Sequence, residues 1–98
     1  LNTLQSMDKI KNYKLIDGSF EVDEAKEVLL GLLDYKIQFH ANKVFSTDIR
    51  FGEHDEMSSK RAVELKATRI EVEELIQKLN FSFKKLRITS TIVVEEIE

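Results

Sequence analysis

Hydrophobic and polar positions alternate most regularly between Asp55 and Leu79, and their spacing predicts one long α-helix. Apolar residues recur three or four positions apart, which places them on one side of a helix. The stretch contains no Gly and no Pro, and Asp55 is a good candidate for its N-cap. The apolar stripe consists of Ala62, Leu65, Val72, Ile76 and Leu79.

Arg69 occupies the one gap in this stripe. A buried Arg is costly unless an acid pairs with it. We therefore expect Arg69 either to extend its charged end to solvent or to pair with an acid of the neighbouring helix, and we favour a contact that fixes the register of a helix pair or dimer. The candidate acids are Glu24, Glu27 and Asp34.

A second helix is predicted from about residue 22 or 23 to Val44. Between Val28 and Leu33 it is apolar over most of its circumference, so it needs contacts on two sides. Gly31 lowers the helix propensity by up to about 1 kcal/mol relative to Ala. Another backbone approaching closely at Gly31 would explain its presence.

Residues 45–54 are predicted to connect the two helices. Ser46 can cap a single extra turn over residues 47–51. Gly52 can end that turn in the left-handed conformation.

Period-two alternation and β-favouring residues predict strands over residues 12–16 and 85–95. Asp17-Gly18 predicts a turn over residues 17–19. The fold class is therefore α+β, with the order βααβ: a long antiparallel helical hairpin and a small antiparallel sheet. We expect a flexible N-terminal segment at residues 1–11, where Met7 is a candidate natural start, and a single domain at residues 12–98.

The predicted long helix would measure about 37 Å at roughly 1.5 Å per residue. A compact chain of 98 residues is only about 33 Å across. A two-stranded ribbon is also marginal alone in water, and the longer last strand leaves an open edge. We therefore expect a molecule that is either elongated or shares its surface with a partner. We favour a homodimer whose sheet a second copy completes, with an unidentified protein partner as the alternative.

Composition narrows the functional classes. The net charge of −3 argues against non-specific nucleic-acid binding, which needs a basic excess. There is no Cys, so no disulfide or thiolate site is possible. The longest apolar run is too short for a bilayer and no signal peptide is visible, so we expect a cytoplasmic protein without membrane contact.

Two polar clusters are candidate binding sites. In the first, Arg50, His54, Lys60 and Arg61 surround a predicted helix N-terminus and could hold a small anionic ligand. The alternative is that Asp55 caps this helix, His54 is solvated and Arg50 pairs with a nearby Glu.

The second cluster comprises Lys84, Lys85 and Arg87 beside Phe81 and Phe83. Basic and aromatic residues on a sheet can hold phosphates and stack bases. The alternative is a corner where the two aromatic rings join the core and the charges face water.

Catalytic and metal chemistry have little support. No phosphate-binding Gly-rich loop, nucleophile elbow or helical zinc motif is present. His40 and His54 do not have the spacing of a known metal motif, and His40 is explained by a position near the C-terminus of the first helix. We expect no catalytic residue, no metal and no cofactor.

Three segments carry a resemblance: residues 13–20 (YKLIDGSF), residues 23–40 (DEAKEVLLGLLDYKIQFH) and residues 50–66 (RFGEHDEMSSKRAVELK). Together they resemble an uncharacterised family of short bacterial proteins of unknown function. The resemblance implies no activity and no functional residue.

The expected function is a homodimeric protein-interaction or assembly module without catalytic activity. One alternative is a nucleic-acid-associated regulator, antitoxin-like or accessory, that uses the segment from Lys84 to Arg87. The other alternative is a binder of a small anion at the connection between the helices.

Overall fold

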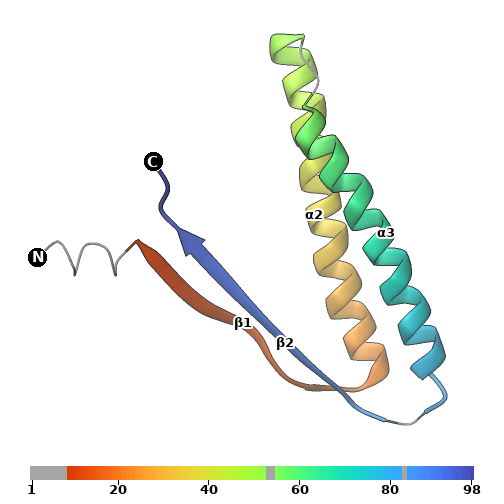
Figure 1. Ribbon diagram of the computed structural model, residues 1–98. Coiled ribbons are helices and arrows are strands. Elements are labelled where there is room, and N and C mark those ends of the chain that lie inside the picture. Colours follow the sequence, from red (N-terminus) through yellow and green to blue (C-terminus); the bar gives the residue numbers. More distant parts are fainter. Residues whose placement is uncertain (1–8, 53–54, 83) are drawn as a thin grey trace, which may run out of the picture.

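The computed structural model describes residues 9–52, 55–82 and 84–98, and within this part the chain forms two strands and two helices. In order these are β1 (Ile10–Phe20), α2 (Val22–Phe51), α3 (Glu56–Leu79) and β2 (Leu86–Glu95). The strands pair antiparallel and the helices form a hairpin (Figure 1). The predicted α+β class and the order βααβ are confirmed.

The molecule is open and thin. The ribbon of strands and the helical hairpin share one end, where α2 follows β1, and diverge from there like the arms of a V (Figure 1). The principal extents are 48 × 44 × 14 Å, and the radius of gyration is 17.8 Å. A compact chain of this length would have a radius of gyration of about 12–13 Å. The chain is therefore extended, as a flat and open V and not as a rod.

Strand β1 is longer than predicted. It starts at Ile10 rather than at residue 12 and continues to Phe20, so the predicted turn over residues 17–19 is wrong. Gly18 instead pairs with Ile88 in the sheet. The pairing with β2 overrides the local turn preference of Asp17-Gly18, and the irregularity lies earlier, between Lys14 and Ile16. Of the predicted flexible segment 1–11, residues 10 and 11 belong to β1, and residues 1–8 lie outside the described part.

Helix α2 is also longer than predicted. The turn expected as a separate element at residues 47–51 continues α2 without a break. Gly52 ends the helix with φ 65°, and its N–H donates to the carbonyl of Asp48 at 3.1 Å, as its left-handed role requires. The helix begins with a capping box between Glu21 and Glu24. His40 therefore lies well inside the helix, and its predicted position near a helix C-terminus is wrong.

Helix α3 agrees with its prediction. The Asp55 side chain accepts a hydrogen bond from the N–H of Ser58 at 2.9 Å, which confirms the N-cap. Leu65 and Ile76 are the buried apolar residues of this helix, and Ala62, Val72 and Leu79 are half-buried on the same side. Arg69 lies among them and pairs with Asp34, one of its three predicted partners.

The core is small. The buried apolar residues in the described part are Val22, Ala25, Leu30, Leu65 and Ile76. Ala25 is the one with no exposed surface, and no large side chain there is fully buried. Gly31, where a close backbone approach was expected, has no described atom within 4 Å of the position a Cβ would take. The close approach is absent from the single chain.

Candidate interaction surface

The two faces of the ribbon differ in chemistry. Residues that pair across an antiparallel sheet share a face. Tyr13 pairs with Ile92, Gly18 with Ile88, and Phe20 with Leu86. We call this the apolar sheet face; its apolar residues are Tyr13, Ile16, Phe20, Leu86, Ile88, Ile92 and Val94, and it also carries Lys11, Gly18 and Ser90.

Exposure of the apolar sheet face increases away from the helices. Phe20, Leu86 and Ile88 are half-buried near the shared end of the two arms. Toward the free end, Ile92 is 42% exposed and Tyr13 is 56% exposed. The free end of this face, formed by Tyr13, Ile92 and Val94, is therefore apolar surface without a covering layer.

The opposite sheet face is polar and paired around Asp17, whereas Ile10 and Val93 are exposed apolar residues at its free end. Arg87 donates to Asp17 at 2.8 Å across the two strands, and Lys14 lies 3.2 Å from the same carboxylate. This face carries the polar residues of an ordinary solvated sheet surface.

A second apolar surface runs along α2. Val28, Leu32, Tyr35 and Phe39 recur at spacings of four, three and four, the repeat of a helix-packing seam. We call them the α2 outer stripe, because the seam with α3 uses other positions such as Leu33 and Ile37. Tyr35 is 70% exposed and Phe39 is 46% exposed. The sequence predicted that α2 needs contacts on two sides. Along the α2 outer stripe, α3 covers one side of the helix and the other side stays uncovered.

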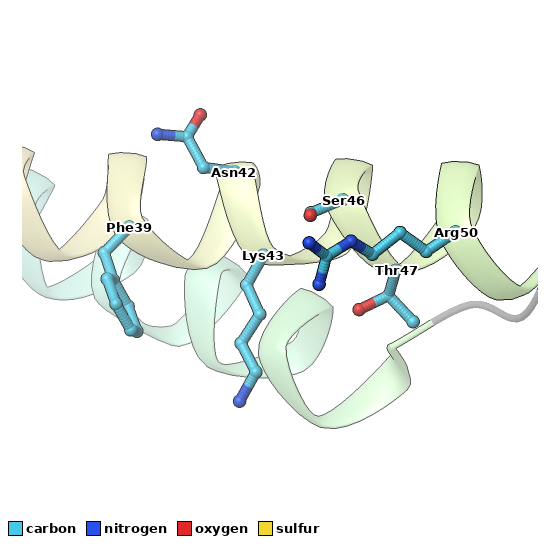
Figure 2. Close-up of a pocket in the computed structure, with 6 residues that line it drawn as sticks. All are labelled: Phe39, Asn42, Lys43, Ser46, Thr47 and Arg50. Carbon is cyan, nitrogen blue, oxygen red and sulfur yellow. The ribbon is translucent and has the colours of Figure 1, made fainter.

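A shallow pocket lies where the α2 outer stripe meets the polar end of the helix. In Figure 2, the Arg50 side chain runs back along α2 toward Ser46, and Phe39 and Lys43 point to one side of the helix while Asn42 points to the other. Lys36 places its ammonium 4.8 Å from the centre of the Phe39 ring on the neighbouring turn. The lining residues are Phe39, Asn42, Lys43, Ser46, Thr47 and Arg50.

The predicted anion site is not assembled as one cluster. Lys60 and Arg61 line a hollow at the start of α3 together with His40 and Lys43, whereas Arg50 lines the pocket of Figure 2. His54 lies outside the described residues. Within the hollow, the carboxylate of Asp55 already accepts the N–H of Ser58, the kind of donor that an anion at a helix N-terminus would use.

The cations of this hollow are partly offset by the carboxylates of Asp55 and Glu64. Arg61 pairs with Glu64 at 3.1 Å. The hydrogen bond from Ser58 lowers the pKa of Asp55 below its usual value, so this carboxylate is ionised at neutral pH.

His40 has a partner that the sequence did not indicate. Its Nδ1 lies 3.2 Å from the hydroxyl oxygen of Ser58, which is buried at the start of α3. Desolvation lowers the pKa of His40, and the nearby charges of Lys36, Arg61 and Lys43 lower it further. The contact ties the interior of α2 to the start of α3, and no spacing rule could have found it because the two residues belong to different helices.

The basic segment between α3 and the sheet is largely paired with acids. Lys85 lies 3.7 Å from Glu21, and Arg87 lies 2.8 Å from Asp17. Phe81 is 81% exposed, and Phe83 lies outside the described residues. The predicted core corner is therefore wrong for Phe81.

Metal and membrane sites have no counterpart in the described part of the chain. Over residues 9–52, 55–82 and 84–98, no group of three His, Asp or Glu side chains is arranged to hold a metal ion. Neither of the two helices there is long and apolar enough to cross a membrane.

Comparison of the chain with protein-family models, with curated proteins and with solved structures finds no match. The resemblance to a family of short bacterial proteins stays a prediction. The apolar sheet face and the α2 outer stripe are therefore the features of the described part from which we infer a function.

Proposed function

We propose that this chain is a homodimeric protein-interaction or assembly module, in which a second copy covers the surfaces that the open fold leaves exposed. The observation that carries the proposal is the excess of exposed surface. The chain exposes 8256 Å², whereas a compact monomer of 11.4 kDa exposes about 5,800 Å².

The size of this excess fits a homodimer. The difference is about 2,500 Å² per chain, comparable with what each subunit of a large obligate homodimer loses on assembly. Both the apolar sheet face and the α2 outer stripe belong to every copy, so a twofold arrangement can cover each of them twice.

The alternative functions have less support. A nucleic-acid interface at Lys84, Lys85 and Arg87 would have to compete with Glu21 and Asp17 for two of these cations. An anion site at Lys60 and Arg61 would have to accommodate the carboxylates of Asp55 and Glu64. In each cluster the cations outnumber the neighbouring carboxylates by one, which is less than the strong positive field that anion binding favours.

Native mass spectrometry, supported by light scattering at several protein concentrations, tests the proposal. We expect a mass of two chains without an additional component. A monomer at concentrations of tens of micromolar would contradict the homodimer. A bound non-protein mass would favour a ligand-binding function instead.

A further inference from the structure

We propose that β2 pairs antiparallel with β2 of a second copy about a twofold axis near Thr91, so that Arg87 of each chain lies opposite Glu95 of the partner subunit. This gives a four-stranded sheet in the order β1-β2-β2-β1. The inference rests on the proposed homodimer and adds to it the surface, the direction and the register of the contact.

The outer edge of β2 is available for pairing. In the described part of the chain the sheet has two strands, β1 and β2. The N–H of Glu96, just after β2, donates to the carbonyl of Lys9 at 2.8 Å, so this residue turns its backbone groups toward the first strand. Successive residues of an antiparallel strand direct these groups to alternate sides. Residues 87, 89, 91, 93 and 95 therefore direct theirs to the outer edge.

Of the two free edges of the sheet, the edge of β2 is better suited than the edge of β1 to pair with a further strand. The pairing of β1 is irregular between Lys14 and Ile16, and such irregularities twist an edge away from further pairing. The register of β2 is continuous, and the strand contains neither Gly nor Pro. Its middle consists of strongly β-favouring residues, from Ile88 to Val94.

The charges of β2 select an antiparallel partner. Basic residues stand at its start and acidic residues at its end, separated by an uncharged middle. A parallel pair would place like charges side by side, whereas an antiparallel pair places each basic end against an acidic end. The charged residues are Lys84, Lys85 and Arg87 at the start and Glu95, Glu96 and Glu98 at the end.

The register follows from the faces of the strand. The apolar sheet face continues across the axis when even-numbered residues oppose even-numbered residues. With Thr91 on the axis, Ile88 lies opposite Val94 of the partner subunit, and Arg87 lies opposite Glu95 of the partner subunit. Arg87 already binds Asp17 through Nη2, and a guanidinium carries five N–H donors, so it can bind a second carboxylate.

The proposed pairing of the two β2 strands enlarges the sheet from two strands to four. Two strands are marginal in water, whereas four strands with one continuous apolar face can be stable when a layer covers that face. Helix α2 contacts both strands near the shared end of the two arms, where it covers part of this face.

Spin labels test the contact directly, because the chain has no native Cys and a single introduced Cys carries the only label. A nitroxide on Thr91→Cys would lie near the axis, so we expect strong dipolar broadening from labels within about 10–15 Å of each other. A nitroxide on Asn12→Cys, in the outer strand, would be separated from its symmetry mate by about 20 Å, given strand spacings of about 4.8 Å.

Charge reversal provides a second test that needs no label. Glu95→Lys places a Lys opposite Arg87 of the partner subunit, and the twofold axis repeats this repulsion. We expect the dimer dissociation constant to rise several-fold at low salt and the effect to shrink at high salt. The matched control is Glu74→Lys, an equal charge change at an exposed site on α3, which should leave the dissociation constant unchanged.

The outcomes separate this inference from the homodimer itself. A dimer with close labels at Asn12 and distant labels at Thr91 would assign the contact to β1 and overturn the inference. The interface would lie elsewhere if the dimer responded equally to Glu95→Lys and Glu74→Lys and the labels at Thr91 and Asn12 were all far apart. That result would overturn the inference and keep the homodimer. A monomer would overturn both.

Discussion

Arg69 on α3 holds Asp34 on α2 through two hydrogen bonds, from Nε to Oδ1 at 2.6 Å and from Nη2 to Oδ2 at 3.3 Å. Its remaining nitrogen Nη1 pairs with Glu73, one turn along its own helix. The hydrogen bond to Asp34 raises the pKa of Arg69, and the charges of Asp34 and Glu73 raise it further. The guanidinium is therefore held in a bidentate geometry with Asp34, which fixes the register between α2 and α3.

Replacing Arg69 should destabilise the helical hairpin through this contact. Arg69→Met keeps the apolar stem and removes the fork, and Asp34→Asn removes the charge that it binds. We expect each change to lower the urea midpoint, and the double variant to lower it by less than the sum of the two. Equilibrium unfolding at fixed protein concentration measures this coupling, which should weaken with added salt.

The matched control for this coupling is the pair Arg61 and Glu64, which lie 3.1 Å apart within α3 and are both half-exposed or more. Exposed pairs one turn apart contribute little. Arg61→Met and Glu64→Gln should therefore leave the midpoint nearly unchanged. Strictly additive effects at Arg69 and Asp34 would contradict the register role.

Leu65 and Val63 provide a comparison of two apolar residues on one helix. Leu65 is 7% exposed in the seam with α2, whereas Val63 is 64% exposed. Leu65→Ala should reduce the free energy of unfolding by about 2–5 kcal/mol, because it leaves a cavity in the seam. Val63→Ala should change it by about 0.5 kcal/mol or less. Equal losses at both positions would show that a partner covers the outer side of α3.

The helices and strands could be predicted because their signals are local. The stripe from Ala62 to Leu79 identified α3, and Asp55 and Gly52 marked helix ends through their own side-chain and backbone chemistry. Arg69 was predicted to bind one of three acids because the interrupted stripe required it. Which of the three acids it binds depends on how α2 and α3 pack against each other, and the spacing of residues within one helix does not reveal this.

The errors arose where a distant partner decides the structure. Asp17-Gly18 is a turn sequence, but β2 lies beside it and keeps it extended. The contact of His40 with Ser58 depends on how far α2 extends, and α2 continues beyond its predicted end. The α2 outer stripe was visible as apolar residues, but only the packed hairpin shows that α3 leaves it uncovered.

Gly31 should be replaceable with a gain in stability. It is exposed inside α2, and an added Cβ would meet no described atom within 4 Å. Gly31→Ala should raise the free energy of unfolding by up to about 1 kcal/mol, because Ala is the better helix former. Thermal and urea unfolding measure the gain. A loss of stability together with a weaker dimer would instead show that the second copy approaches α2 at this position.

The hydrogen-bonded pair of His40 and Ser58 should make stability depend on pH. Desolvation and the neighbouring cations lower the pKa of His40 in the folded chain, so the unfolded chain binds a proton more readily. Stability is then complete above the ordinary His pKa of about 6.5 and decreases as the pH falls below it. The nearby Asp55 opposes this effect only in part.

NMR titration and unfolding at two pH values test this dependence. The imidazole of His40 should titrate below the ordinary value, and the urea midpoint should decrease between about pH 7.5 and pH 5.5. His40→Gln should show a smaller decrease over the same interval. A His40 midpoint at or above the ordinary value would contradict the assigned environment.

The α2 outer stripe should contribute to the dimer if a second copy covers it. Phe39 is 46% exposed at the centre of α2, where its ring contacts the edge of His40 and lies beneath Lys36. Phe39→Lys adds a charge that a covered surface would have to desolvate, and the two copies would each pay this cost, so we expect the dimer to weaken at least tenfold. Val63→Lys on the outer side of α3 is the control and should leave assembly unchanged. Sedimentation equilibrium of both variants measures whether a second copy covers the α2 outer stripe. A dimer unaffected by Phe39→Lys would mean that the sheet alone joins the two copies and that the stripe is open to a different protein.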